Sequence, residues 1–160
     1  MDARRALLLS AFAIGFYDVG SIWIVDQLIY PSWPMIGPVE VDAVRAEHWH
    51  RLPGVVFLPA GLALAVAVAM VRLRPPGVPG RAVWLGLALQ VAASLVTAVW
   101  FAPLQARMST PEGGLSGPVF RQLATTHWVR VAIITAYGAL TFWMVAKGAW
   151  PEGGGKRTDA

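Results

Sequence analysis

The chain contains no cysteine, so it cannot form disulfides, thiolate nucleophiles, iron–sulfur clusters or zinc–thiolate sites. Charge is also scarce: Asp, Glu, Lys and Arg make up 14% of the residues, whereas a soluble domain carries about 25%. The net charge of +4 does not indicate nucleic-acid binding, because in a strongly apolar chain basic residues mark the cytoplasmic ends of helices. No internal repeat and no separate soluble domain is visible in the sequence.

Hydrophobic residues make up 56% of the chain, and they gather in four runs near the length of about 20 residues that a spanning helix needs. The sequence therefore predicts an all-α fold, an integral membrane four-helix bundle that forms a single domain over residues 1–150. Helices are expected at about 6–30, 54–72, 82–102 and 122–147, with ends set by Pro31, Pro53 and Pro103. The first run is not a signal peptide, because it carries Asp18 and lacks a small-residue cleavage site. Residues 151–160 are expected to form a disordered tail.

Basic residues are unevenly distributed between the ends of these helices. Eight Lys or Arg lie in the two termini and the connection 72–81, and four lie in the other two connections. Because excess Lys and Arg marks the cytoplasmic side, both termini are predicted to be cytoplasmic. Segments 32–53 and 103–126 are then outside, and the protein is multi-pass.

Polar side chains recur at helical spacing within three of the four expected helices. Polar groups are costly in hydrocarbon, so they are expected to face the bundle interior. Asp18 and Asp26, eight residues apart, share one side of the first helix. The other members of these stripes are Tyr17, Trp23, Gln90, Ser94, Thr97, Thr126, His127, Arg130 and Tyr137.

The stretch AEHWHRLP before the second helix concentrates titratable groups, and the predicted topology places it on the same side as His127 in THWVR. Glu47 and His50 have the i, i+3 spacing of carboxylate-bridged metal sites. With His48 and His127 they could hold one metal. The alternatives are a polar cluster that hydrogen-bonds the helix start, and metal-free acid–base use of a histidine.

Asp18 and Arg130 each have a structural and a functional interpretation. They could form an ion pair that fixes the first helix against the fourth, or Asp18 could be protonated and face a substrate cavity. Arg130 could extend to the interface, or bind an enolate, phenolate or carboxylate. Tryptophans at the outer ends, including Trp23, Trp49 and Trp100, fit an interfacial belt or the lining of a pocket for a flat or polyene substrate.

The order of short motifs resembles a known layout. These motifs are Tyr30-Pro31, the histidine-containing segment, PPGVPG at 75–80, Pro103-Leu104-Gln105 and THWVR. Over roughly Leu7 to Trp143 they resemble a large group of small four-helix bacterial membrane proteins of DUF1772-like layout, a grouping that includes the anthrone oxygenase-like proteins of aromatic polyketide pathways. In that group the fourth helix more often begins Asn-Trp-Ile-Arg, where this chain has His127-Trp128-Val129-Arg130.

The resemblance implies a bacterial inner membrane and cofactor-free oxygenase chemistry, in which a base creates a carbanion or phenolate that reacts directly with O₂. We therefore expect a membrane-embedded enzyme that acts on a hydrophobic, aromatic, polyketide-like substrate. Its candidate catalytic residues are His127, Arg130, His48, His50, Asp18 and Glu47. Its candidate substrate-binding residues are Tyr17, Trp23, Asp26, Trp49, Gln90, Trp100 and Tyr137.

Two alternatives stay open. One is a membrane cyclase or isomerase in which Asp18 donates a proton inside a tryptophan-lined cavity. The other is a non-catalytic scaffold or haem- or metal-binding protein, with His48, His50 and His127 as the ligands. No cofactor is predicted for the oxygenase. The expected partners are a hydrophobic small molecule and the lipid bilayer, not nucleic acid, and a homo-oligomer is compatible with the sequence.

Overall fold

The computed structural model describes residues 2–37, 39–108 and 115–149, so the expected disordered tail lies outside the described residues. Within these ranges, four helices are long and apolar enough to cross a membrane. They are Ala3–Met35, Val41–Arg72, Gly80–Arg107 and Pro118–Gly148. The protein is therefore an all-α, multi-pass membrane protein, as the apolar runs predicted. Each helix extends beyond the residues expected from its apolar run.

Three of the four helices consist of shorter elements joined end to end. The first contains α1 (Ala3–Ile24), α2 (Tyr30–Ser32) and a 3-10 turn (Trp33–Met35). The second contains α3 (Val41–Leu52) and α4 (Leu58–Arg72), and the third contains α5 (Gly80–Val96) and α6 (Ala102–Arg107). The fourth is the single helix α7 (Pro118–Ala149).

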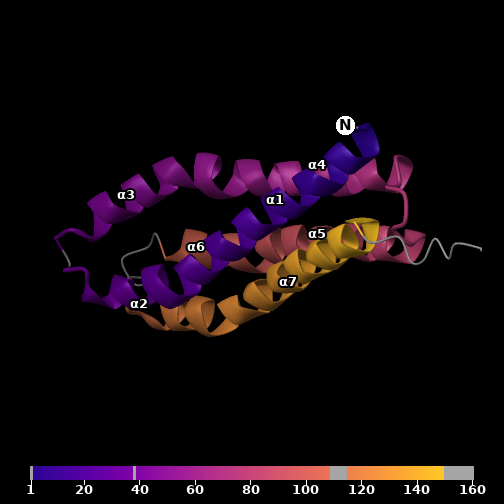
Figure 1. The fold of residues 1–160 in the computed structure, drawn as a ribbon. Helices are drawn as coiled ribbons and strands as arrows, with labels where there is room; N and C mark the ends of the chain where they lie inside the picture. Colours follow the sequence, from indigo (N-terminus) through magenta and orange to yellow (C-terminus); the bar gives the residue numbers. More distant parts are fainter. Residues whose placement is uncertain (1, 38, 109–114, 150–160) are drawn as a thin grey trace, which may run out of the picture.

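The helices form an up-down-up-down bundle in which α1 packs on α4 and α7, and α5 packs on the same two helices (Figure 1). The N-terminus, the α4–α5 turn and the end of α7 lie together at one end. We call this the turn end. The elements α2, α3, α6 and the start of α7 lie at the opposite end, which we call the α3 end.

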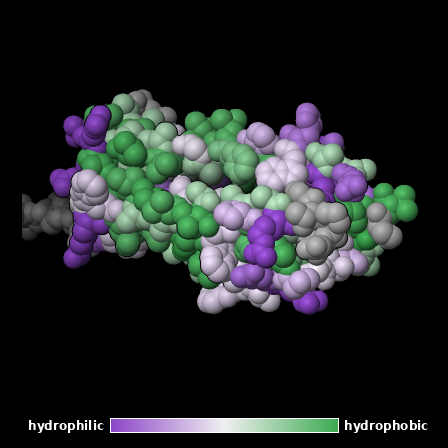
Figure 2. Space-filling view, turned by 180° about the vertical axis from the view of Figure 1, so that it is seen from behind, coloured by the Kyte–Doolittle hydropathy of each residue, from purple (hydrophilic) through white to green (hydrophobic). Residues whose placement is uncertain are grey.

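The outer surface matches a lipid environment. Figure 2 shows hydrophobic residues over the middle of the visible face, with hydrophilic residues gathered towards the two ends. Large apolar side chains are exposed on all four helices, including Leu9, Leu62, Leu85, Leu95 and Phe142. An apolar surface of this extent, on helices of spanning length, indicates contact with a bilayer.

Prolines shape the helices without ending them. Three π-helical turns, η1 (Val25–Ile29), η3 (Pro53–Phe57) and η4 (Thr97–Phe101), each end two residues before a proline. These prolines are Pro31, Pro59 and Pro103. A proline has no N–H for the carbonyl four residues earlier and clashes with it, and the wider π turn relieves that clash. This is why the first and third helices continue past Tyr30 and Ala102, where the prolines predicted an end.

One of the carbonyls released by a proline has found another donor. Pro59 cannot donate to Val55, and the Tyr17 hydroxyl donates to the Val55 carbonyl at 3.0 Å instead. In a membrane such replacement donors are what makes a proline tolerable inside a helix. The hydrogen bond also joins α1 to the second helix at this level of the bundle.

The long helix α7 presents a heptad seam to the rest of the bundle. Its seam positions alternate in steps of four and three residues: Leu123, His127, Arg130, Ile134, Tyr137, Thr141, Met144 and Gly148. Six of them are buried, and Ile134 and Gly148 are partly buried. Four of these eight positions are polar, which is unusual for a membrane helix and places polar chemistry inside the bundle.

Glycines allow close contact along this seam. A Cβ on Gly15 of α1 would lie 3.1 Å from Tyr137 Cε1, and one on Gly86 of α5 would lie 3.6 Å from Tyr137 Cε2. A Cβ on Gly138 would lie 2.6 Å from a methyl group of Val19. Small residues that let helices approach are the usual packing device in membranes, where lipid is as apolar as the helix surface.

We expect Gly138→Ala to lower the free energy of unfolding by about 1–3 kcal/mol, because the stiff β-branched side chain of Val19 must move. The control is Gly61→Ala, since a Cβ there meets nothing within 4 Å. Thermal unfolding in detergent, followed by circular dichroism, measures both. Equal stability of the two variants would contradict close α1–α7 packing.

Candidate functional site

The buried imidazole of His127 is the centre of the candidate site. The residue is 0% exposed, and neither Nδ1 nor Nε2 has a hydrogen-bond partner among the described residues. The backbone of Ile22 lies within reach of a hydrogen bond to the ring, but the geometry is too poor to complete one. Buried polar groups are nearly always paired, and an unpaired one costs about 1–3 kcal/mol. An unpaired buried imidazole of this kind is therefore a candidate for a functional role.

Aromatic rings enclose His127. The Tyr30 ring meets it edge-on with centroids 4.7 Å apart, and the Phe101 ring does so at 5.8 Å. Tyr30 directly follows the π turn η1, and Phe101 is the last residue of η4. The two proline-linked π turns therefore position both rings, and π turns occur frequently at functional sites.

Arg130 lies one turn further along α7 and completes this group. Its guanidinium carbon is 4.7 Å from the centre of the Phe101 ring, a cation–π contact. The side chain is 8% exposed, and its Nε has no hydrogen-bond partner among the described residues. We call Tyr30, Phe101, His127 and Arg130 the His127 centre. It combines a base, a fixed positive charge and apolar walls.

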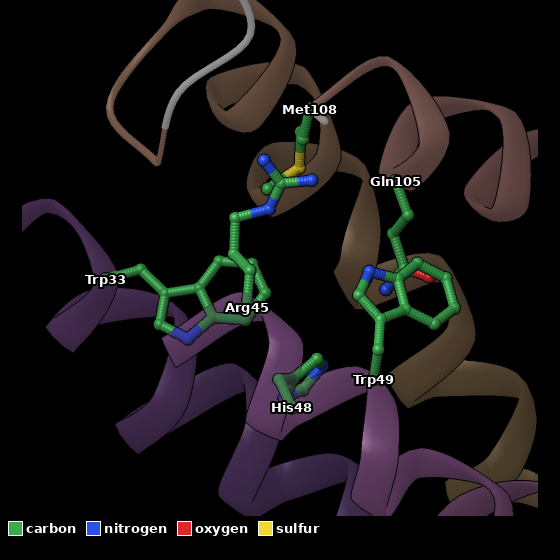
Figure 3. A pocket seen from close by; sticks show the side chains of 6 residues that line it. All are labelled: Trp33, Arg45, His48, Trp49, Gln105 and Met108. Atoms are coloured by element: carbon green, nitrogen blue, oxygen red, sulfur yellow. The ribbon is translucent and has the colours of Figure 1, made fainter. Parts of the chain in front are cut away.

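A small hollow at the α3 end lies next to this centre. Its free volume is about 10 Å³, room for about one water molecule, and it is lined by Trp33, Arg45, His48, Trp49, Gln105 and Met108. Figure 3 shows the two indole rings on opposite sides, with His48 at the base and Arg45 and Met108 at the far edge. We call it the α3 hollow. Two indole rings and an imidazole make its walls largely aromatic, and a flat aromatic group would fit only after these side chains move apart.

A chain of ring contacts joins the α3 hollow to the His127 centre. The His48 imidazole packs edge-on against Trp33 at 5.1 Å, and Trp33 packs against Tyr30 at 5.2 Å. Tyr30 then contacts His127. Gln105 lies beside the Tyr30 hydroxyl from the other wall. The two histidine-containing stretches therefore lie at the same end of the bundle and are linked through Trp33 and Tyr30.

The remaining residues of AEHWHRLP point elsewhere. Glu47 and Arg51 are exposed and form an i, i+4 ion pair on α3, and His50 is exposed. Trp49 is partly exposed and lines the hollow. Across the described ranges, no group of three His, Asp or Glu side chains gathers as metal ligands. His48, His50 and His127 thus do not form a common ligand set in this structure.

Asp18 does not pair with Arg130. No ion pair joins the two side chains in the described part of the chain. Asp18 is half-buried in α1 and interacts electrostatically with Tyr137, whose hydroxyl is buried without a hydrogen-bond partner there. The buried amide of Gln90 lies close to the same hydroxyl without completing a well-aligned hydrogen bond. Asp18, Gln90 and Tyr137 thus form a second polar group, near the middle of the bundle.

The other candidate binding residues tie helices together. Tyr17 bonds the Val55 carbonyl, as described above. The indole of Trp23 donates to Thr135 Oγ1 at 3.1 Å, and that of Trp100 donates to Thr126 Oγ1 at 3.1 Å. Asp26 accepts a hydrogen bond from the amide of Gln27 at 2.6 Å and acts electrostatically on His127.

The sequence interpretation missed Tyr30 and Phe101 as site residues, although both contact His127. The signal was present in Pro31 and Pro103, which follow them by one and two residues. A proline inside an apolar run marks either a helix end or a distorted turn, and the sequence alone favours a helix end. The π turns show that the second applies.

Comparison with known proteins identifies no relative: no protein-family model, no curated protein and no solved structure matches the chain. The resemblance to the DUF1772-like group is therefore supported only at the coarse level of four long apolar helices.

Replacing His127 with leucine tests whether this residue is kept for a reason other than stability. We expect His127→Leu to leave the melting temperature in detergent unchanged or to raise it, because two unpaired buried nitrogens disappear. The control is Leu123→Ala on the same seam, which leaves a cavity and should cost about 2 kcal/mol or more. A loss in His127→Leu as large as in Leu123→Ala would show that the imidazole has a structural role.

Proposed function

We propose that this protein is a membrane-embedded enzyme that removes a proton from a hydrophobic aromatic substrate and lets the resulting anion react with O₂. The observation that carries the proposal is the His127 centre, where an unpaired imidazole and a guanidinium lie together within an aromatic enclosure. A base and a positive charge for an oxyanion are the two groups that such chemistry requires from a protein.

In this reaction His127 accepts a proton from an acidic CH₂ group next to the aromatic system. The negative charge moves to the neighbouring carbonyl oxygen, where the Arg130 guanidinium stabilises it. The electron-rich carbon is oxidised by O₂ to a hydroperoxide, which takes up the proton from His127. The hydroperoxide then loses water and leaves a new carbonyl. One oxygen atom of O₂ enters the product, and the other leaves as water with both hydrogens of the CH₂ group.

The α3 hollow supports a route for the substrate. Trp33 lines the hollow on one side and contacts Tyr30 of the His127 centre on the other. Movement of these two rings would open a path from the hollow to His127, and a flat apolar molecule can replace their mutual contacts with its own. In this proposal the side chains of the hollow and of the His127 centre rearrange to admit the substrate.

The charge distribution supports an orientation with both termini in the cytoplasm. The described cations at the turn end are Arg4, Arg5, Arg72, Arg74, Arg81 and Lys147, against the single acidic residue Asp2. At the α3 end, the five arginines Arg45, Arg51, Arg107, Arg121 and Arg130 are nearly balanced by the four acidic residues Asp26, Glu40, Asp42 and Glu47. By the positive-inside rule, this difference supports a cytoplasmic turn end and a His127 centre towards the outside. A bacterial inner membrane follows only from the resemblance.

Oxygen uptake tests the proposal directly. Purified protein with an anthrone, whose CH₂ group is the expected site of proton removal, should consume O₂, and His127→Ala should lower turnover about 100-fold or more. Arg130→Gln should lower it about 100-fold through the lost oxyanion contact. The control is His50→Ala, because that histidine is exposed and outside the centre. Unchanged turnover in His127→Ala would remove the residue from the mechanism.

A second candidate function rests on Asp18, which is half-buried in the membrane span and unpaired with Arg130. A carboxyl group in apolar surroundings can serve as a proton donor, and an isomerase or cyclase would need one beside aromatic rings.

Anaerobic turnover distinguishes the two candidate functions. An Asp18-dependent isomerisation should proceed without O₂, and Asp18→Asn should abolish it while His127→Ala retains it. The substrate and product would have equal mass. A reaction that stops when O₂ is removed would instead contradict the isomerase.

A further inference from the structure

A second hollow lies at the turn end, far along the bundle from the His127 centre. It is an open groove between α5 and α7 of about 540 Å³, open space included. Its lining consists of Arg81, Ala82 and Leu85 from α5 and Leu140 and Trp143 from α7. Ala82 is buried, whereas Leu85 and Trp143 are exposed. The groove is therefore apolar along its length and carries one cation.

A second cation lies near the first. The guanidinium of Arg74 reaches over the start of α5, with its Nη1 3.4 Å from where a Cβ on Gly80 would lie. Gly80 directly precedes Arg81 in the chain. Within the described ranges no carboxylate pairs with either arginine. The acidic residue described at this end, Asp2, accepts a hydrogen bond from the Arg4 backbone at 3.4 Å.

We propose that this groove binds an anionic glycerophospholipid, with an acyl chain between α5 and α7 and the phosphate at Arg81 and Arg74. Such a lipid matches the two properties of the groove. Its acyl chain matches the apolar surface, and its phosphate carries the charge opposite to that of the two arginines. Basic residues at the membrane surface attract anionic lipids, and a tryptophan at the interface suits the headgroup level.

A helix from a second copy of the chain is a poorer occupant. It would cover Arg81 with apolar surface and leave the guanidinium without an anion, which is costly in a membrane. Lipid also reaches this groove from the bilayer at high local concentration. The proposal concerns a different surface from the His127 centre and does not rest on the proposed function.

Native mass spectrometry of the delipidated full-length protein tests this site, with phosphatidylglycerol and phosphatidylcholine as competing probes. We expect phosphatidylglycerol to be preferred, and Arg81→Ala to reduce that preference about fivefold, with a larger loss in the Arg74→Ala/Arg81→Ala double variant. Arg121→Ala is the matched control, since this exposed arginine lies at the opposite end. Leu85→Trp should reduce binding of both lipids by filling the groove while keeping the charge.

Three results would overturn the proposal. The first is equal retention of the two lipids, which indicates unselective boundary lipid. The second is an equal loss in Arg121→Ala and Arg81→Ala, which indicates a general charge effect. The third is unchanged binding of both lipids in Leu85→Trp, which indicates that no acyl chain lies in the groove. Thermal unfolding of each variant confirms that it is folded before lipid binding is compared.

Discussion

The Tyr137 ring is the contact on which the bundle geometry depends. Glycines of two different helices, Gly15 and Gly86, face opposite edges of this ring, and a Cβ on either would meet it within 4 Å. The ring therefore sets the distances of α1 and α5 from α7. In a bilayer this steric fit has to do what the hydrophobic effect does in water, because lipid offers apolar surface of the same quality. The seam of α7 extends this contact towards both ends.

The same seam carries polar side chains at half of its positions, which creates a conflict between packing and polarity. Thr141 resolves it locally, because its hydroxyl donates to the Gly138 carbonyl at 2.9 Å. His127 and Arg130 do not, since three of their nitrogens lack a hydrogen-bond partner among the described residues. Tyr137 has the same deficit at its hydroxyl. Packing alone does not require these buried nitrogens or the Tyr137 hydroxyl. We therefore expect the polar residues of the seam to have a chemical role.

The sequence predicted the helices well because span length and hydrophobicity are local properties of the chain. Helical spacing also favoured an inward position for His127, whereas for Arg130 it left open whether the side chain points inward or to the interface, and the structure shows it buried. The sequence did not predict which of the residues near His48 belong to the site, because neighbours on a helix point in different directions. His48 packs on Trp33, whereas Glu47 and His50 are exposed. Nor could spacing reveal Tyr30 and Phe101, whose positions depend on how two prolines distort the backbone.

The π turns connect these observations. A regular helix through Pro31 or Pro103 would bring the proline ring against the carbonyl four residues earlier. Each π turn relieves that clash by inserting an extra residue into the turn, which rotates every later side chain relative to the earlier ones. Tyr30 and Phe101 lie at the points where this rotation takes effect, and both contact His127. The prolines therefore do more than bend two helices. They turn two rings from different helices towards one imidazole on α7, and this gives the centre its enclosed, apolar character.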